Sequence, residues 1–225
     1  MSKPRISTAL LMAGLLVSGN RAEAAEIRVL ASNGIKAAME ALEPQFEGAT
    51  GDTLAIGFST AATLKQRIES GEPFDVAILT DGVVDELVAS GRLVAATRAE
   101  LAAVGIGVGF RKGAAKPDVR TGANLKQALL KANSVAYTGN GASRPAIDKM
   151  IASLGIAHEL ESKSHLVGAG EAPASVAKGE SDLVLTLISE ILPEPGVALA
   201  GPLPAESQVY RGFAAAAGAK NRNTA

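Results

Sequence analysis

The sequence predicts an α/β protein of two lobes, in which each lobe is a mainly parallel sheet flanked by helices. Short apolar runs alternate with segments of helical periodicity along most of the chain. The alternation begins again after residue 104, as expected for a second lobe. Parallel neighbours need crossover connections, and the intervening helices provide them.

The composition excludes several functional classes. The chain has 225 residues, of which 47% are hydrophobic and 20% charged, so it can bury a sizeable core. Lysine and arginine total 22 against 23 acidic residues, so no overall positive field would attract nucleic acid. With no cysteine and two histidines, we expect no disulfide, no cofactor and no cation site. Only 3% of residues are aromatic, which favours a ligand that is small or is recognised by backbone groups.

Residues 1–25 have the pattern of an export signal. Lys3 and Arg5 precede an apolar run from Ile6 to Val17, and an alanine-rich segment follows. This run is shorter than the roughly 20 residues that span a bilayer. We therefore expect a cleaved signal peptide, a periplasmic location and a mature chain that does not insert into the membrane.

The first lobe is expected to span residues 26–104. A strand at Ile27–Ala31 precedes a helix whose apolar face runs from Ile35 to Phe46. The same order follows twice more along the chain. The expected elements are strands at Thr53–Phe58 and Phe74–Leu79, a helix at Ala61–Ser70, and a helix from Asp81 to about Gly91.

The second lobe is expected to span residues 105–195, and residues 196–225 a connector and return to the first lobe. Its expected elements are strands at Gly105–Arg111, Ser134–Thr138 and Asp182–Ile188, a helix at Leu125–Ala132, and a helix around Ile147 that ends at Gly155. Prolines between residues 193 and 204 favour a loop, after which Val209–Ala216 returns to the first lobe. A ligand cleft is expected between the lobes, which would move about hinges near Val104–Gly107 and Gln208–Gly212.

Four segments resemble a known family. They are IRVLASNG from Ile27, FSTAATLKQRIESGEPFDVAIL from Phe58, VAYTG from Val135 and ISEILP from Ile188. In these the chain resembles the molybdate-binding periplasmic proteins of ABC importers, a branch of the type 2 periplasmic solute-binding fold. The resemblance implies a monomer that closes its lobes over a small oxyanion, molybdate or tungstate, and presents it to an ABC permease in the inner membrane.

Loops that lead from strands into helices are the expected anion site, because helix N-termini present unpaired N–H groups. The expected ligand-binding residues are Asn33, Gly34, Thr60, Ala61, Ala142, Ser143, Glu171 and Ala172. Ser32, Ser59 and Thr63 supply further hydroxyl groups nearby. The resembled family also uses serines and a tyrosine. This chain instead has Gly34 and Ala61 at the serine positions, and Leu187 or Thr186 at the tyrosine position, which predicts a changed selectivity.

Other residues have simpler expected roles. Arg144 is expected on the surface, with the cleft as its alternative, and Glu171 is expected to stabilise a helix end. His158 and His165 are expected on the surface, and no nucleophile with a neighbouring base is visible. We therefore expect a protein that is not an enzyme.

Two alternatives to import stay open. The first is a secreted sensor or interaction protein of the same fold that binds a small organic ligand. The second, which the absence of an activated nucleophile disfavours, is a secreted hydrolase. The resembled family usually continues into a final helix after the segment that ends here at Ala225, so we expect exposed apolar surface on the first lobe.

Overall fold

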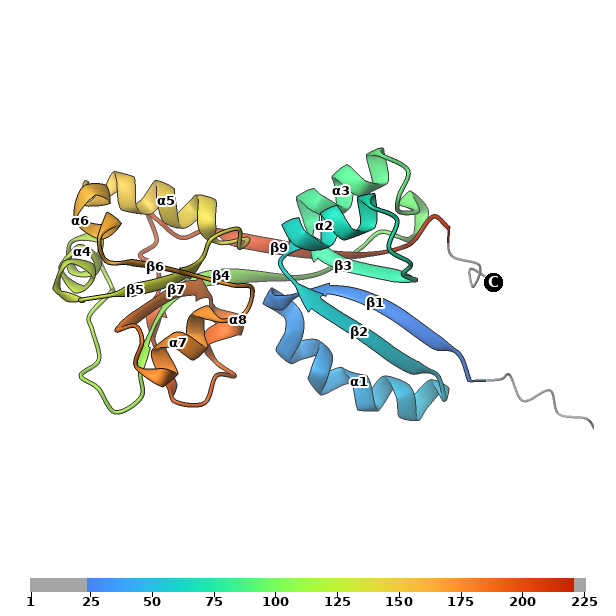
Figure 1. Cartoon of the computed structure of the whole chain (residues 1–225), viewed down its shortest axis with the longest axis horizontal. Helices are drawn as coiled ribbons and strands as arrows, with labels where there is room; N and C mark the ends of the chain where they lie inside the picture. The colour runs from blue at the N-terminus through green and yellow to red at the C-terminus, as the bar shows by residue number, and fades with distance from the viewer. Residues whose placement is uncertain (1–23, 221–225) are drawn as a thin grey trace, which may run out of the picture.

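The computed structural model describes residues 24–220. The expected signal peptide therefore lies outside the described residues, apart from its last two positions. Two lobes are joined by the long strands β4 (Ala99–Arg111) and β9 (Tyr210–Ala217), as Figure 1 shows. Within residues 24–220, no helix has the length and apolar character needed to cross a membrane.

The first lobe is a sheet with helices on both faces. Its parallel strands are β1 (Glu26–Ser32), β2 (Thr53–Ser59) and β3 (Val76–Thr80), in the order β2-β1-β3, and β9 pairs antiparallel with β3. Helix α1 (Lys36–Thr50) lies on one face, whereas α2 (Ala61–Glu69) and α3 (Asp81–Ala89) lie on the other (Figure 1). Short 3-10 helices, η1 (Asn33–Ile35) and η2 (Ala95–Thr97), complete this lobe.

The second lobe repeats the arrangement. Its strands β5 (Val135–Thr138), β6 (Ser164–Val167) and β7 (Leu183–Leu187) are parallel, whereas β8 (Val197–Pro202) and β7 each pair antiparallel with β4. Its helices are α4 (Gly122–Lys131), α5 (Arg144–Ser153), α6 (Ala157–Glu161), α7 (Ala172–Lys178) and α8 (Ile188–Ile191). The expected α/β fold is confirmed. Each antiparallel pair among the named strands of the described residues contains β4, β9 or both.

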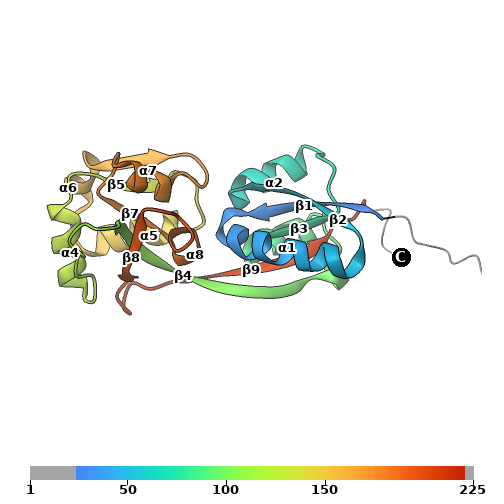
Figure 2. The same ribbon diagram turned by 90° about the horizontal axis from the view of Figure 1, so that it is seen from below.

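The lobes meet along β4 and β9, which pair antiparallel and run side by side between them (Figure 2). Just before β9, the side-chain amide of Gln208 makes two hydrogen bonds to the backbone of Ile106 on β4. Its Oε1 accepts from the Ile106 N–H at 3.0 Å, and its Nε2 donates to the Ile106 carbonyl at 2.9 Å. These bonds fix the start of the return strand. The expected hinge segments contain these residues.

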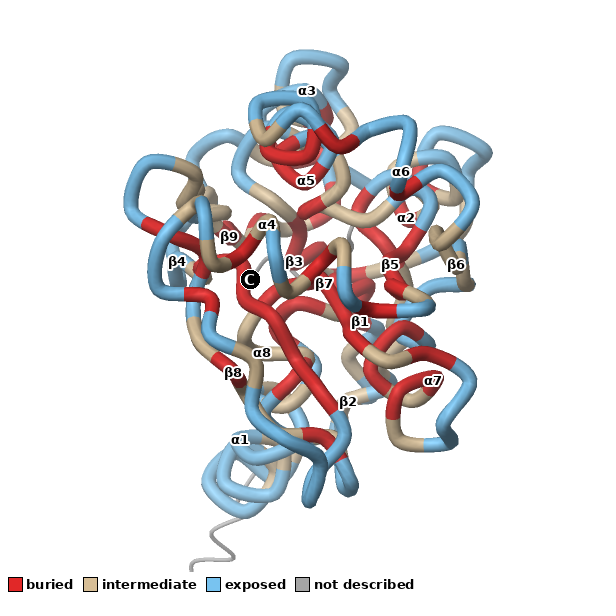
Figure 3. The backbone as a smooth tube through the Cα atoms, turned by 90° about the vertical axis from the view of Figure 1, so that its left-hand side faces the viewer, coloured by how far each residue is buried: buried red, intermediate tan, exposed pale blue. Residues whose placement is uncertain are grey.

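Apolar burial follows the strands. Figure 3 shows buried backbone concentrated in the central strands and exposed backbone on the outer turns. The largest buried cluster joins the lobes, because it includes Ile35 and Phe213 from the first and Leu187 from the second. In contrast, α1 has no buried residue, and Leu42 on it is 55% exposed.

One expectation about secondary structure is wrong. The proline-containing stretch that was expected to be a connector includes β8, which lies at the outer side of β4. Prolines are compatible with this strand because Pro193 and Pro195 precede it and Pro202 ends it, so none interrupts its interior. The expected division of the chain into lobes after residues 104 and 195 stays a prediction. Strand β4 runs across the first of these boundaries, and β8 lies after the second.

Candidate functional site

A small cavity lies between the lobes. Its lining comes from loops and strand ends of both lobes: Ser32, Asn33, Gly34, Thr60, Ala61 and Phe213 from the first, and Thr138, Gly141, Ala142, Ser143, Gly170, Thr186, Leu187 and Glu190 from the second. Its volume is about 20 Å³. A water molecule needs roughly 10 to 15 Å³ on a comparable measure, so in this arrangement of the lobes the cavity has room for little more than one water molecule.

Six of the eight expected ligand-binding residues line this cavity. They come from three loops: Asn33 and Gly34, Thr60 and Ala61, and Ala142 and Ser143. Glu171 and Ala172 do not line it, and Gly170 from the same loop takes their place. The reason is local: the Glu171 carboxylate turns back to accept the Gly168 N–H at 2.9 Å, and Ala172 is packed inside the second lobe.

The first lobe supplies donors without a formal charge. Thr60 caps α2, because its Oγ1 accepts the Thr63 N–H at 3.2 Å. The N–H groups of Ala61 and Ala62 precede the first intrahelical bond and have no partner within the helix. The positive end of the helix dipole therefore points at the cavity wall formed by Thr60 and Ala61.

Ser32 is a second donor on this wall. It ends β1 and is only 3% exposed, and its buried Oγ has no hydrogen-bond partner in the described structure. A buried hydroxyl without a partner is unfavourable unless a ligand or water completes its bonding. Because Ser32 lines the cavity, its hydroxyl is available to a group bound there.

Gly34 is a position at which the family resemblance leads us to expect a serine. A Cβ atom at this position would lie 2.5 Å from Cζ of Phe213 and 2.6 Å from Cδ1 of Leu187. A serine side chain therefore has no room unless both apolar side chains move. The space that would hold a serine hydroxyl is occupied here by apolar atoms, which explains the glycine and supports the expected change in selectivity.

The second lobe contributes hydroxyls more than N–H groups. Ser143 precedes α5 and is 4% exposed, and its side chain makes no capping bond. The first N–H groups of α5 are already used: Arg144 donates to Gly141, Ala146 donates to Ser143, and Pro145 has no N–H. The hydroxyls of Thr138 and Thr186 lie on the same wall.

Glu190 is the one ionisable residue among those that line the cavity. Its Oε2 accepts a short hydrogen bond from the Thr186 hydroxyl. Burial raises the pKa of Glu190, and hydrogen bonds from the Thr186 hydroxyl and the Leu187 backbone oppose that rise only in part. The carboxyl group therefore takes up a proton more readily than an exposed glutamate.

Two side-chain hydrogen bonds connect the lobes around the cavity. The Ser189 hydroxyl donates to the Gly34 carbonyl at 2.5 Å, and Asn140 Nδ2 donates to Thr63 Oγ1 at 3.3 Å. The first is partly buried and the second exposed. Both hold the lobes in the closed arrangement.

The other candidate residues lie away from the cavity. Arg144 donates from Nε to Asp148 and lies over the Tyr137 ring, 4.9 Å from its centre. His158 is exposed near Glu161, as expected, whereas His165 is half-buried in β6, where its Nδ1 lies 2.8 Å from the Ser181 hydroxyl. Within residues 24–220, no three His, Cys, Asp or Glu side chains form a group able to hold a metal ion.

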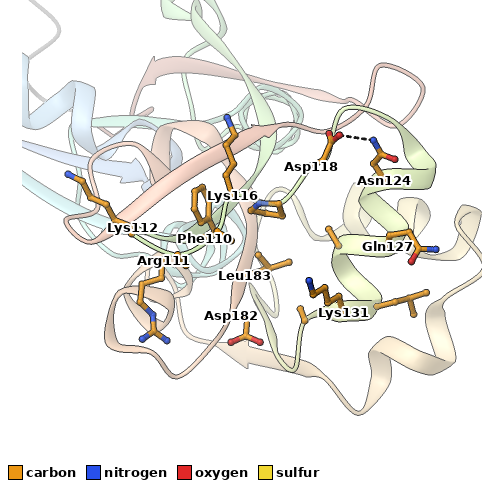
Figure 4. Close-up of a pocket in the computed structure, with 17 residues that line it drawn as sticks. Phe110, Arg111, Lys112, Lys116, Asp118, Asn124, Gln127, Lys131, Asp182 and Leu183 are labelled. Atoms are coloured by element: carbon orange, nitrogen blue, oxygen red, sulfur yellow. Dashed lines mark hydrogen bonds between the residues drawn. The ribbon is translucent and has the colours of Figure 1, made fainter.

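A much larger groove lies on the outer side of the second lobe. Its volume is about 1240 Å³, and its lining includes Arg111, Lys112, Lys116 and Lys131. Figure 4 shows that the side chains of Arg111, Lys112 and Lys116 extend in different directions instead of meeting at one point. This groove therefore presents no focused anion site.

Sequence reasoning missed part of the cavity lining. Glu190 carries a recognisable signal, because it is an acid in the mostly apolar segment ISEIL. Phe213 carries no local signal, since it reaches the cavity only because β9 returns to the first lobe. Thr138, Gly141 and Gly170 lie within a few residues of expected positions.

Known proteins are similar to this chain in sequence and in architecture. The chain is 30% identical over 214 residues to an aconitate isomerase from a Pseudomonas species, covering 91% of this chain and 81% of the relative. It is 30% identical over 184 residues to the molybdate-binding protein ModA from Azotobacter vinelandii, covering 80% and 71%.

The solved structures show the same fold. A periplasmic molybdate-binding protein from Azotobacter vinelandii superposes with a TM-score of 0.73 at 19% identity, over 88% of this chain and 87% of that one. The resemblance to molybdate-binding proteins expected from the sequence is thus confirmed. The model of the family described as "Bacterial extracellular solute-binding protein" matches residues 27–225. The chain belongs to this family of bacterial extracellular solute-binding proteins.

Proposed function

We propose that this protein is the periplasmic binding component of an ABC importer, and that it captures a small oxyanion, molybdate or tungstate first, between its lobes. The observation that carries this proposal is the small cavity whose walls come from both lobes, with the unpartnered Ser32 hydroxyl and the N-terminus of α2 facing it. Neutral donors in a closed site bind oxyanions without a cationic side chain.

Several observations support this proposal. The cavity of about 20 Å³ is closer to the size of a compact ion than to that of an extended organic molecule, and the lobes must move apart to hold either. The relative ModA is named as a molybdate-binding protein, and the export signal expected at residues 1–25 would place the mature chain beside an inner-membrane permease. In this role the protein acts as a monomer whose lobes open to admit and release the ion.

The test is a thermal-shift and calorimetric titration of the purified protein with molybdate, tungstate, sulfate, phosphate and small carboxylates. A ligand that binds only the folded state stabilises it by about 2.7 kcal/mol at 100 times its dissociation constant. We expect molybdate or tungstate to give the largest shift. If a folded sample shows no shift with any oxyanion, the proposal is wrong.

A second candidate function is isomerisation of a small unsaturated carboxylic acid. The aconitate isomerase relative favours it, together with one observation at the site: Glu190 is a half-buried carboxyl group facing the cavity. Moving a double bond requires removal of a proton from one carbon and its return to another, which a carboxyl group of raised pKa can perform. The lobes would have to open for such a substrate, since the closed cavity is small.

Incubation with each isomer of aconitate in deuterated water tests this candidate. Conversion with deuterium incorporation, lost in Glu190→Gln, would support catalysis. Stabilisation by aconitate without any conversion would instead indicate a binding protein for small carboxylates.

A further inference from the structure

Glu190 is an unexpected group in a cavity for an anion. It lines the same space as the N-terminus of α2 and the Ser32 hydroxyl, and this space is about 20 Å³. Any anion that fills so small a cavity lies close to the carboxyl group. Two negative charges at such a distance, with little water between them, repel each other strongly.

Among residues 24–220, no charged side chain contributes to the shift of the Glu190 pKa. Helix α8 packs on β4, β7, β8, η1 and α1, and the strands β7 and β8 and the helix η1 carry no ionisable residue. The charged residues on β4 are Glu100 and Arg111 at its two ends, and those on α1 are Lys36, Glu40, Glu43 and Glu47.

The cations among these residues are engaged elsewhere. Lys36 forms an ion pair with Glu40 at 2.6 Å and lies over the Phe58 ring, and Arg111 lines the outer groove of the second lobe. The pKa of Glu190 is accordingly raised by burial, with no contribution from a charged neighbour.

We propose that Glu190 shares one proton with the bound anion, so that a fully deprotonated oxyanion enters the site together with a proton taken up by this carboxyl group. The proton comes from solvent, and the resulting O–H donates to an oxygen of the anion while Thr186 continues to donate to Oε2. No other bond changes. This inference rests on the proposed function, because it requires an anion in the cavity.

The inference also defines a class of ligand. An oxyanion that keeps its own proton, such as hydrogen phosphate, can donate that proton to an ionised Glu190 and needs none from solvent. A fully deprotonated ion such as sulfate needs the protonated carboxyl group. Glu190 is then a residue that determines specificity by the protonation state of the ligand.

Glu190 also occupies the third position of α8, from which a glutamate side chain caps its own helix through the Leu187 backbone. A purely capping role predicts no change in protonation on binding. The number of protons taken up therefore distinguishes the two roles, and Glu190→Gln retains the shape and the hydrogen bond from Thr186.

The experiment is calorimetric titration of the purified protein with sulfate and molybdate, in buffers of different ionisation enthalpy, between about pH 6.5 and about pH 8.5. We expect uptake approaching one proton per anion at the upper end, and affinity that falls by up to about tenfold for each pH unit. Glu190→Gln should show no uptake and no such pH dependence, and should bind sulfate at least about tenfold more tightly than the unaltered protein at the highest pH.

Glu171→Gln is the matched control. Its carboxylate belongs to the neighbouring loop but bonds the Gly168 N–H and does not line the cavity, so proton uptake should persist. Phosphate should bind the unaltered protein with less proton uptake than sulfate.

Three results would overturn the inference. If sulfate and molybdate bind with no proton uptake, and bind equally well to Glu190→Gln, the anion site stands and only the proton sharing is wrong. Equal proton uptake with phosphate and with sulfate would contradict the proposed distinction between anions that keep a proton and anions that do not. If a folded, unaltered protein binds no anion at any pH, the proposed function fails and this inference fails with it.

Discussion

The interlobe cavity and the outer groove of the second lobe are opposites in size and charge. The groove has a volume of about 1240 Å³ and four lysine or arginine side chains in its lining, whereas the cavity has about 20 Å³ and none. The side chains of Arg111, Lys112 and Lys116 in the groove extend in different directions (Figure 4), whereas hydroxyl groups and a helix N-terminus line one small space in the cavity. If the cavity is the anion site, as proposed, enclosure and fixed donors matter more for a small anion than volume or the number of cations.

The physical reason lies in solvent. Charges on flexible lysines at an open surface are screened by water and salt, and each interaction contributes little. Backbone N–H groups at the α2 N-terminus are held rigidly by the helix, and Thr60 and Ala61 there are buried, at 6% and 5% exposed.

The largest effect is expected from Gly34→Leu. A side chain here collides with Phe213 and Leu187, so the lobes can no longer close over the cavity. Anion affinity measured by calorimetry should fall by about a hundredfold or more, which corresponds to about 2.7 kcal/mol. Gly48→Leu is the control: a Cβ atom there meets no other atom within 4 Å, and affinity should not change. Retained affinity in Gly34→Leu would remove this loop from the site.

Ser32→Ala should have an intermediate effect. The loss of one hydrogen bond of about 0.5 to 1.5 kcal/mol predicts an affinity about twofold to thirteenfold lower. The ligand-free protein should be at least as stable as before, because the substitution removes a buried hydroxyl without a partner. Thermal denaturation without and with anion measures both effects.

Ser153→Ala is the matched control for Ser32→Ala. The Ser153 hydroxyl bonds the Met150 carbonyl on α5, away from the cavity lining, so its removal should leave anion affinity unchanged. Lower stability of ligand-free Ser32→Ala would mean that the hydroxyl has a structural partner.

Ser189→Ala tests how far closure contributes. It removes the hydrogen bond to the Gly34 carbonyl that connects the lobes, so the closed form becomes less populated. We expect affinity about twofold to fivefold lower, with faster dissociation in stopped-flow measurements. Asn140→Ala removes the longer, exposed bond to Thr63 and should have a smaller effect. If Asn140→Ala lowers affinity more than Ser189→Ala does, the exposed hydrogen bond to Thr63 is the more important contact between the lobes.

The same contrast explains what the sequence could predict. Thr60 and Ser143 could be predicted from the sequence, because both lie in loops that lead from a strand into a helix. Such loops are local features that a few neighbouring residues specify. Phe213 and the closed cavity depend on where β9 returns, which no local pattern specifies. The turn of Glu171 towards Gly168, away from the cavity, is a side-chain choice between two nearby partners, and residue order does not determine it.

The smallest effect is expected when the groove loses charge. The double substitution Lys116→Gln and Lys131→Gln removes two cations from its lining, and neither residue lines the interlobe cavity. Equilibrium affinity for molybdate should stay within about twofold, and any decrease in the association rate should vanish in high salt, because long-range attraction is screened beyond about 10 Å at 0.1 M. A tenfold loss that persists in high salt would show that the anion binds in the groove, and the contrast drawn between the two regions would be wrong.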